Sequence, residues 1–182
     1  MLELSLHILD LVENCLNAGA TLVTVEITEK QAENFLEIII EDNGRGMTPE
    51  FLARATDPFT TTRTTRRVGL GLSLMQANAQ AWGGGLELAS QVGQGTRVRI
   101  WCELDHVDRQ PLGDWAGSLV GLILTQPTVD FVYRHTVDDD DVELDTRELK
   151  EEAGAGVVQD ALVMKQLAEQ IREALAELGS RA

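Results

Sequence analysis

The residues with the clearest chemical potential follow an apolar run. The segment FLEIII, residues 35–40, leads directly into Glu41, Asp42 and Asn43 and then into two glycines around one arginine. A carboxylate at the end of an apolar element is costly unless something hydrogen-bonds it. That partner could be a ligand, and Gly44 and Gly46 would let the backbone approach it closely. Taken alone, the segment is equally well explained as a turn.

A second set of polar residues lies on one face of a helix predicted over residues 4–18. Apolar residues recur at helical spacing on one side, and His7, Asp10, Asn14 and Asn17 recur on another. Asn14 offers an uncharged oxygen suited to Mg²⁺. Asp10, one turn earlier, could polarise water or orient a hydroxyl. The alternative is a solvated helix face.

A third candidate site stands before another predicted helix, which begins near Gly71 and ends before the glycines at 83–85. Gly69 and Gly71 precede it, and free amides at a helix N-terminus bind phosphate. Arg63, Arg66 and Arg67 could supply countercharge. Residues 48–69 have little apolar periodicity, which predicts a mobile loop with one helical turn.

Several common chemistries are excluded by what the sequence lacks. The phosphate-loop pattern GxxxxGK[ST], a third glycine for a dinucleotide fingerprint and the metallohydrolase pattern HExxH are all absent. Serine catalysis lacks a nucleophile elbow, and His7, His106 and His135 are scattered. Cys15 and Cys102 have no CxxC spacing, so neither a disulfide framework nor a zinc site is indicated.

Composition and net charge limit the classes of partner that the protein is expected to bind. The 182 residues include 43% hydrophobic residues, enough for a core, and carry a formal net charge of -15. Such a charge repels nucleic acid and anionic lipid, so neither is an expected partner. The first residues show no cleavable leader, and no apolar run is long enough for a membrane span. We therefore expect a cytoplasmic protein.

The remaining elements predict the fold class. Segments 21–28 and 35–42 are rich in β-branched residues and form one expected hairpin, and 86–92 and 96–104 form another. The order helix, two strands, loop, helix, two strands predicts an α+β fold. We expect a two-layer α/β sandwich with helices on one face of a mixed, mainly antiparallel sheet.

A smaller unit is expected after a linker at 105–114. We assign residues 1–104 to one domain and 105–182 to a small acidic α/β extension. The extension is expected to contain a helix (115–126), a strand (129–137), an acidic turn (138–141), a helix opened by Asp145 and Glu148, and a long last helix. The acidic turn lacks the ligand pattern of a calcium loop. The apolar stripe of the last helix packs on its own domain or meets a partner, and we favour the first.

Together the pieces resemble a known family. In fixed order stand DLVENCLNAGA (10–20), EDNGRGM (41–47), DPFTTTR (57–63), RVGLGL (67–72) and GQGTRV (93–98). The first four are similar to the N, G1, F and G2 boxes of the GHKL superfamily, and Thr96 in the fifth matches the family threonine that reaches the adenine site. The superfamily comprises the ATP-binding domains of histidine kinases, DNA gyrase B, ninety-kilodalton heat-shock chaperones and MutL-type repair proteins. The resemblance covers about residues 4–104 and implies a Bergerat-type fold that binds Mg-ATP under a mobile lid.

The resemblance also implies roles for individual residues. Asp42 matches the adenine-binding aspartate, Asn14 the magnesium-binding asparagine and Asp10 the catalytic position. The ATP-hydrolysing branches carry glutamate there, so the shorter aspartate is a departure. Arg67 and Val68 depart from the usual glycine and threonine of the G2 box. The implied ATP-binding set is Asn14, Asn17, Asp42, Gly44, Gly46, Met47, Phe59, Thr61, Arg63, Gly69, Leu70, Gly71, Leu72 and Thr96.

Three uses of ATP are compatible with these boxes. The F and G2 boxes resemble those of kinases more than those of gyrase, which favours a signal-transducing kinase. Histidine kinases carry their acceptor histidine on helices before this domain, and only 13 residues precede Asn14, so the acceptor is expected on a separate protein. The alternatives are a slow ATPase and a non-enzymatic, ATP-dependent conformational sensor. Small stand-alone proteins that resemble this chain accompany iron hydrogenase genes, which implies a hydrogenase-associated partner. A homodimer is a further possibility.

Overall fold

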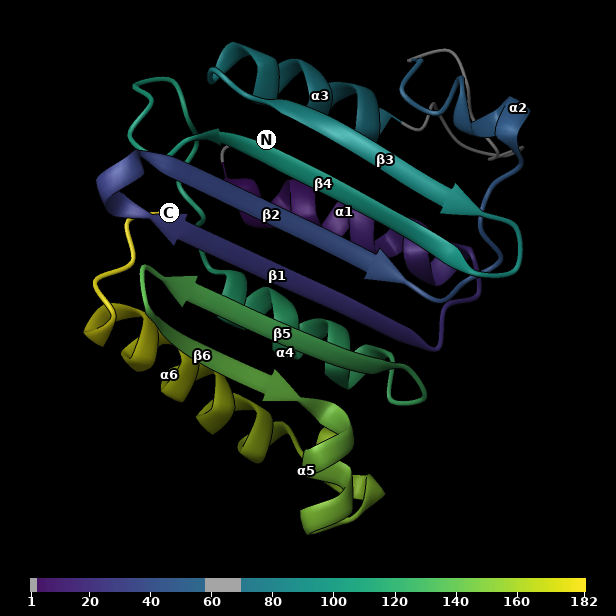
Figure 1. The fold of residues 1–182 in the computed structure, drawn as a ribbon. Coiled ribbons are helices and arrows are strands. Elements are labelled where there is room, and N and C mark those ends of the chain that lie inside the picture. Colours follow the sequence, from purple (N-terminus) through teal and green to yellow (C-terminus); the bar gives the residue numbers. More distant parts are fainter. Residues whose placement is uncertain (1–2, 58–69) are drawn as a thin grey trace.

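The computed structural model of the protein describes residues 3–57 and 70–182 and is built on one six-stranded sheet (Figure 1). The strands lie in the order β3-β4-β2-β1-β5-β6. All neighbouring pairs are antiparallel except β1 and β5, which are parallel. The strand bounds are β1 Leu22–Lys30, β2 Phe35–Asp42, β3 Gly85–Gln91, β4 Gly95–Glu103, β5 Asp130–Val137 and β6 Asp140–Asp145.

The long helices cover one face of this sheet, as Figure 1 shows. They are α1 Leu4–Asn17, α3 Leu70–Ala81, α4 Trp115–Thr125 and α6 Ala161–Glu177. Shorter helices are α2 Pro49–Leu52, α5 Thr146–Ala153 and the 3-10 turns Gln31–Glu33 and Ala155–Gln159. The predicted two-layer α+β architecture and mixed sheet are therefore confirmed.

The alternating strand sequences explain why only one face is covered. Val23, Val25 and Ile27 of β1 are buried against the helices, whereas the residues between them are partly exposed. A period of two places successive side chains on opposite faces of a strand. Apolar side chains on the helix-covered face of all six strands are thus part of one continuous hydrophobic core or pack against it.

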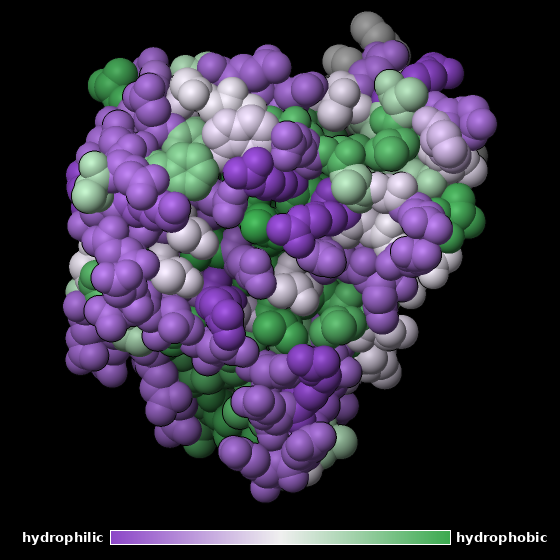
Figure 2. Space-filling model, viewed as in Figure 1, coloured by the Kyte–Doolittle hydropathy of each residue, from purple (hydrophilic) through white to green (hydrophobic). Residues whose placement is uncertain are grey.

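The other face of the sheet is open and mostly hydrophilic (Figure 2). Arg97 pairs with Glu41 at 2.8 Å, and Arg99 pairs with both Glu37 and Glu87. These ion pairs join β4 to its neighbours on both sides. Exposed pairs contribute little stability each, but they keep this surface polar.

The C-terminal part of the chain extends the same sheet. β5 lies parallel to β1, with Val23 opposite Phe131, and β6 forms the edge. The acidic turn is shorter than predicted, because β6 already begins at Asp140. The predicted N-cap Asp145 is confirmed, since its side chain accepts the Arg147 N–H at 2.8 Å. The two-domain division at residue 104 stays a prediction.

The last helix packs on the chain itself. Met164, Ala168 and Ile171 are buried and belong to the common core. α6 lies beside α4, and these two helices cover β5 and β6 (Figure 1). The expectation that the apolar stripe packs internally is confirmed for these three residues.

A buried polar network fastens the C-terminal segment to β1. Glu29 accepts a hydrogen bond from the Ser180 hydroxyl at 2.5 Å and from the Arg181 N–H at 2.7 Å. His135 Nε2 lies 2.7 Å from the same carboxylate, and its Nδ1 lies 2.9 Å from the Tyr133 hydroxyl. Burial alone would raise the pKa of Glu29, but the hydrogen bonds from His135, Ser180 and Arg181 hold it below its usual value.

Candidate functional site

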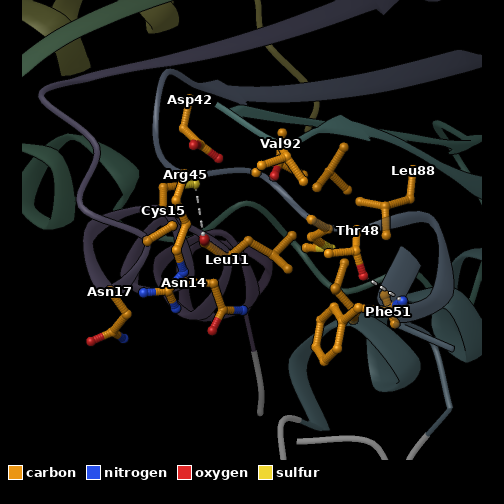
Figure 3. Close-up of a pocket in the computed structure, with 17 residues that line it drawn as sticks. Leu11, Asn14, Cys15, Asn17, Asp42, Arg45, Thr48, Phe51, Leu88 and Val92 are labelled. Atoms are coloured by element: carbon orange, nitrogen blue, oxygen red, sulfur yellow. Dashed lines mark hydrogen bonds between the residues drawn. The ribbon is translucent and has the colours of Figure 1, made fainter. Parts of the chain in front are cut away.

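A cavity of about 730 Å³ opens between α1, the ends of β2 and β4, and α2 (Figure 3). Its polar lining includes Asn14, Asn17, Asp42, Arg45 and Thr96. Its apolar lining includes Leu11, Met47, Phe51, Leu72, Leu88 and Val92. Cavities of this size and mixed character are typical of small-molecule sites.

Asp42 is the last residue of β2 and is only 7% exposed. Its Oδ1 accepts the Gly44 N–H at 2.7 Å, and the carboxylate points into the cavity (Figure 3). Thr96 is its cross-strand partner on β4, so the two side chains reach the cavity together. The structure brings these two predicted residues together, and their roles toward a ligand stay predictions.

The loop after Asp42 is held from both sides. Asn43 Oδ1 accepts the N–H groups of Thr21 and Leu22, at 2.9 and 3.0 Å. The Arg45 N–H donates to Ala18 at 3.0 Å, and its carbonyl accepts from Gly93 at 2.8 Å. Asn43 is thus a structural residue, although it stands beside the candidate ligand-binding aspartate.

Neither Gly44 nor Gly46 of this loop leaves room for a side chain. A Cβ on Gly44 would lie 2.8 Å from Asp42 Oδ1 and 2.9 Å from the Ala18 Cβ. Gly46 has a φ of +66°, and a Cβ there would lie 2.0 Å from the Gln91 carbonyl oxygen. Only glycine satisfies both limits, so the loop can pass close to β3 and leave the cavity open.

Ser90 joins this loop to the strands and was not identified from sequence. Its hydroxyl accepts the Met47 N–H at 2.9 Å and donates to the Gly95 carbonyl at 2.8 Å. It also lies 3.0 Å from Thr96 Oγ1. A serine in a strand gives no local signal, and only the β3–β4 register places it opposite Thr96.

Helix α1 supplies the other polar side of the cavity. Asn14 and Asn17 both line it and are exposed. Asp10 is not among the lining residues, but it adjoins the first turn of α3. A Cβ added to Gly71 would lie 3.6 Å from the Asp10 Cβ and 4.0 Å from Asn14 Nδ2. The predicted stripe therefore faces both the cavity and the first turn of α3.

Gly71 lies within α3 and does not precede it, which corrects one part of the prediction. The described part of the helix starts at Leu70, near the predicted start, and Leu72 lines the cavity. The remaining predicted residues of this region, Phe59, Thr61, Arg63 and Gly69, lie outside the described residues, as do Arg66 and Arg67.

Cys15 is a further cavity residue that sequence analysis did not assign. It is buried beside Asp42, and its thiol donates to the Leu11 carbonyl at 3.3 Å (Figure 3). Burial raises the pKa of this thiol, and the neighbouring Asp42 raises it further. The thiol therefore stays protonated near neutral pH and acts as a small apolar lining group.

His7, on the same stripe as Asp10, lies away from the cavity lining. It is 1% exposed, and its Nε2 is 3.0 Å from Gln110 Oε1 and 3.3 Å from Asn78 Nδ2. Burial lowers its pKa. It links α1 to α3 and to the segment before α4, which is a structural role.

A metal would have to be held with few protein ligands. Within residues 3–57 and 70–182, no three His, Cys, Asp or Glu side chains are grouped to hold an ion. The amide oxygen of Asn14 fits Mg²⁺, which retains waters and is commonly bound by one or two protein ligands together with phosphates. Over the same residues, no helix combines the length and apolar character needed to cross a bilayer.

Comparison with known families gives a match over more than half of the chain. Residues 2–106 match the family model described as histidine kinase-, DNA gyrase B-, and HSP90-like ATPase. The matched region includes α1, the first four strands and every side chain named above as lining the cavity.

Several curated proteins are similar to the same region. The histidine protein kinase DivJ of Caulobacter vibrioides is 36% identical over 97 residues, which is 51% of this chain and 16% of that protein. A putative sensor protein of Shewanella frigidimarina is 34% identical over 103 residues, 56% of this chain and 16% of that protein. A probable C4-dicarboxylate sensor kinase of Bacillus subtilis is 33% identical over 95 residues, 50% of this chain and 18% of that protein. This chain thus spans less than a fifth of each relative.

Solved structures share the fold. The N-terminal domain of a DNA repair protein superposes with a TM-score of 0.55 at 16% identity, covering 86% of this chain and 58% of that one. The MutL ATPase domain of Aquifex aeolicus, solved with ADP, gives a TM-score of 0.50 at 21% identity, covering 85% of this chain and 68% of that one. Both superpositions cover more of this chain than the region that matches the family model.

Proposed function

Because the chain belongs to the family of histidine kinase-, DNA gyrase B- and HSP90-like ATPases, we propose that it binds Mg-ATP at Asp42 and phosphorylates a separate protein. It carries an ATPase domain of the histidine kinase type. We assign nucleotide binding to residues 1–104 and treat residues 105–182 as an extension of the same sheet.

The observation that carries the proposal is the Asp42 carboxylate at a cavity wall. A nearly inaccessible carboxylate is costly unless it accepts hydrogen bonds, and within the chain Oδ1 has the Gly44 N–H. The exocyclic amine of adenine would supply a further donor from the cavity side. The MutL domain with the same fold was solved with ADP, which supports an adenine nucleotide as the ligand.

The residues of α1 suit the phosphate end of such a ligand. Asn14 would hold Mg²⁺, which when bound neutralises charge on the phosphates. In the transfer, a nucleophile of the partner forms a bond to the γ-phosphorus while the bond to the ADP oxygen breaks, and the electron pair leaves with ADP. Asp10, exposed beside Gly71, is placed to accept the nucleophile's proton.

The positions of the histidines support an acceptor on another protein. His7 and His135 are buried at 1% and 0% exposure and are engaged by side chains within the chain. His106 follows the end of β4 that is opposite to the cavity end at Thr96. None of the three is therefore presented to the cavity.

A labelling experiment tests the transfer. The protein would be incubated with γ-labelled ATP and a cell extract, and label would be followed on proteins and as free phosphate. Label on a second polypeptide is expected. Free phosphate without labelled protein would indicate an ATPase instead, and tight ATP binding with neither product would indicate a nucleotide sensor.

Magnesium dependence tests the role of Asn14. We expect Asn14→Ala to lose the increase in ATP affinity that Mg²⁺ gives to the wild-type protein, as measured by calorimetry with and without the metal. Asn17→Ala is the matched control, because Asn17 is an exposed asparagine lining the same cavity. Equal loss of the magnesium effect in both variants would contradict the assignment.

A further inference from the structure

We propose that the Arg45 guanidinium binds the phosphate chain of the nucleotide, so that this residue makes affinity depend on nucleotide charge. The inference rests on the proposed function, because it assumes an adenine nucleotide at Asp42. Arg45 stands between the two required glycines and lines the cavity.

The backbone of Arg45 is fixed while its side chain is exposed. Its N–H and carbonyl are bonded to Ala18 and Gly93, so the loop offers the side chain from a set position. In the view of Figure 3, the guanidinium lies between the amides of Asn14 and Asn17 and away from Asp42. A ligand that places its base at Asp42 and its phosphates beside α1 would bring those phosphates toward Arg45.

Charge also favours this role. Among the described residues that line the cavity, only Asp42 and Arg45 carry a formal charge, and Arg45 is the cation. The whole chain has a net charge of -15, which repels a polyanionic nucleotide at long range. A local cation would offset this repulsion, and a planar guanidinium can form two parallel hydrogen bonds to one phosphate.

Arg45 differs in its pairing from the arginines of the sheet. Arg97, Arg99 and Arg134 each form an ion pair with a glutamate on a neighbouring strand. In the part of the chain that the structure describes, no carboxylate lies within ion-pair distance of Arg45. The polar α1 side chains that line the same cavity, Asn14 and Asn17, are uncharged and leave the positive charge available.

The test compares ATP with adenosine. Arg45→Gln retains a polar hydrogen-bonding group on a shorter side chain and removes the charge. We expect its affinity for ATP to fall about tenfold or more, the size of a charge-assisted hydrogen bond, with adenosine affinity unchanged. NMR titration measures both ligands, because it reaches the weak affinity expected for adenosine.

Arg134→Gln is the matched control, since Arg134 is an exposed arginine on β5 outside the cavity lining. It should bind both ligands like the wild type, and thermal unfolding should show that both variants are folded. Equal losses for ATP and adenosine, or no loss for ATP, would overturn the role of Arg45. A wild-type protein that binds neither ligand would instead overturn the proposed function.

Discussion

Two buried carboxylates lie at opposite ends of the first hairpin, and their surroundings differ. Glu29 near the end of β1 is 0% exposed, and Asp42 at the end of β2 is 7% exposed. Both point to the helix-covered side of the sheet, where Asp42 lies opposite Val23 and Glu29 opposite Leu36. Glu29 is surrounded by donors from β5 and the C-terminal segment, whereas Asp42 faces a cavity.

The difference separates a structural carboxylate from a candidate ligand-binding carboxylate. A buried carboxylate must accept hydrogen bonds, and the chain supplies them to Glu29 from His135, Ser180 and Arg181. Asp42 accepts one hydrogen bond, from the Gly44 N–H. The neighbouring glycines have no side chains that could fill the space beside it. Burial alone thus does not identify a candidate site, and the adjoining cavity is what distinguishes Asp42 from Glu29.

The largest expected effect is on stability, at the structural carboxylate. Glu29→Ala should lower the free energy of unfolding by about 3–5 kcal/mol, because it leaves buried donors without their acceptor. Urea unfolding followed by circular dichroism measures the change. The matched control is Glu26→Ala, on the open face of the same strand, where we expect less than about 1 kcal/mol. Similar losses in the two variants would show that the network does not fasten the C-terminal segment.

The second effect should fall on binding and spare stability. Asp42→Asn places an amide donor opposite the amine of adenine, while its carbonyl oxygen can still accept the Gly44 N–H. We expect ATP affinity to fall about 100-fold or more in calorimetry, with the urea midpoint close to that of the wild type. Unchanged affinity would refute the adenine assignment. A large loss of stability would place Asp42 with Glu29 as a structural residue.

The smallest effect concerns acid pH. The pKa of Glu29 lies below its usual value, so the folded state binds protons less readily than the unfolded state. The stabilisation from ionised Glu29 is therefore present above the unfolded pKa and is lost as pH falls through the folded pKa. Urea midpoints of the wild type should fall more steeply than those of Glu29→Gln below about pH 4.5. Parallel curves would contradict this origin of acid sensitivity.

Much of the fold was predictable because its elements are local. The β-branched residues of segment 21–28 predicted β1, and the hairpin partner β2 follows within a few residues. The position of β5 was not predictable in this way. Its pairing with β1 joins residues more than a hundred positions apart, and no local pattern encodes which strand edge a later strand will meet.

The residues of the candidate site likewise fall into those that a local sequence pattern identifies and those that only the fold brings together. The segment EDNGRGM carries its own signal, so Asp42, Gly44 and Gly46 were identified before their positions were known. Ser90 and Cys15 were not identified, because their contributions depend on cross-strand register and on the approach of α1 to the end of β2. Arg45 was visible in the motif, but its orientation toward Asn14 and Asn17 is a property of the folded loop.

The parallel pairing of β5 with β1 has a consequence during synthesis. Until residues 130–137 have left the ribosome, β1 is an edge strand whose backbone donors and acceptors are unpaired and whose Val23, Val25 and Ile27 are only partly covered. Such an edge is a template for association with other chains. Nascent chains that stop before β5 should therefore need chaperone protection or aggregate.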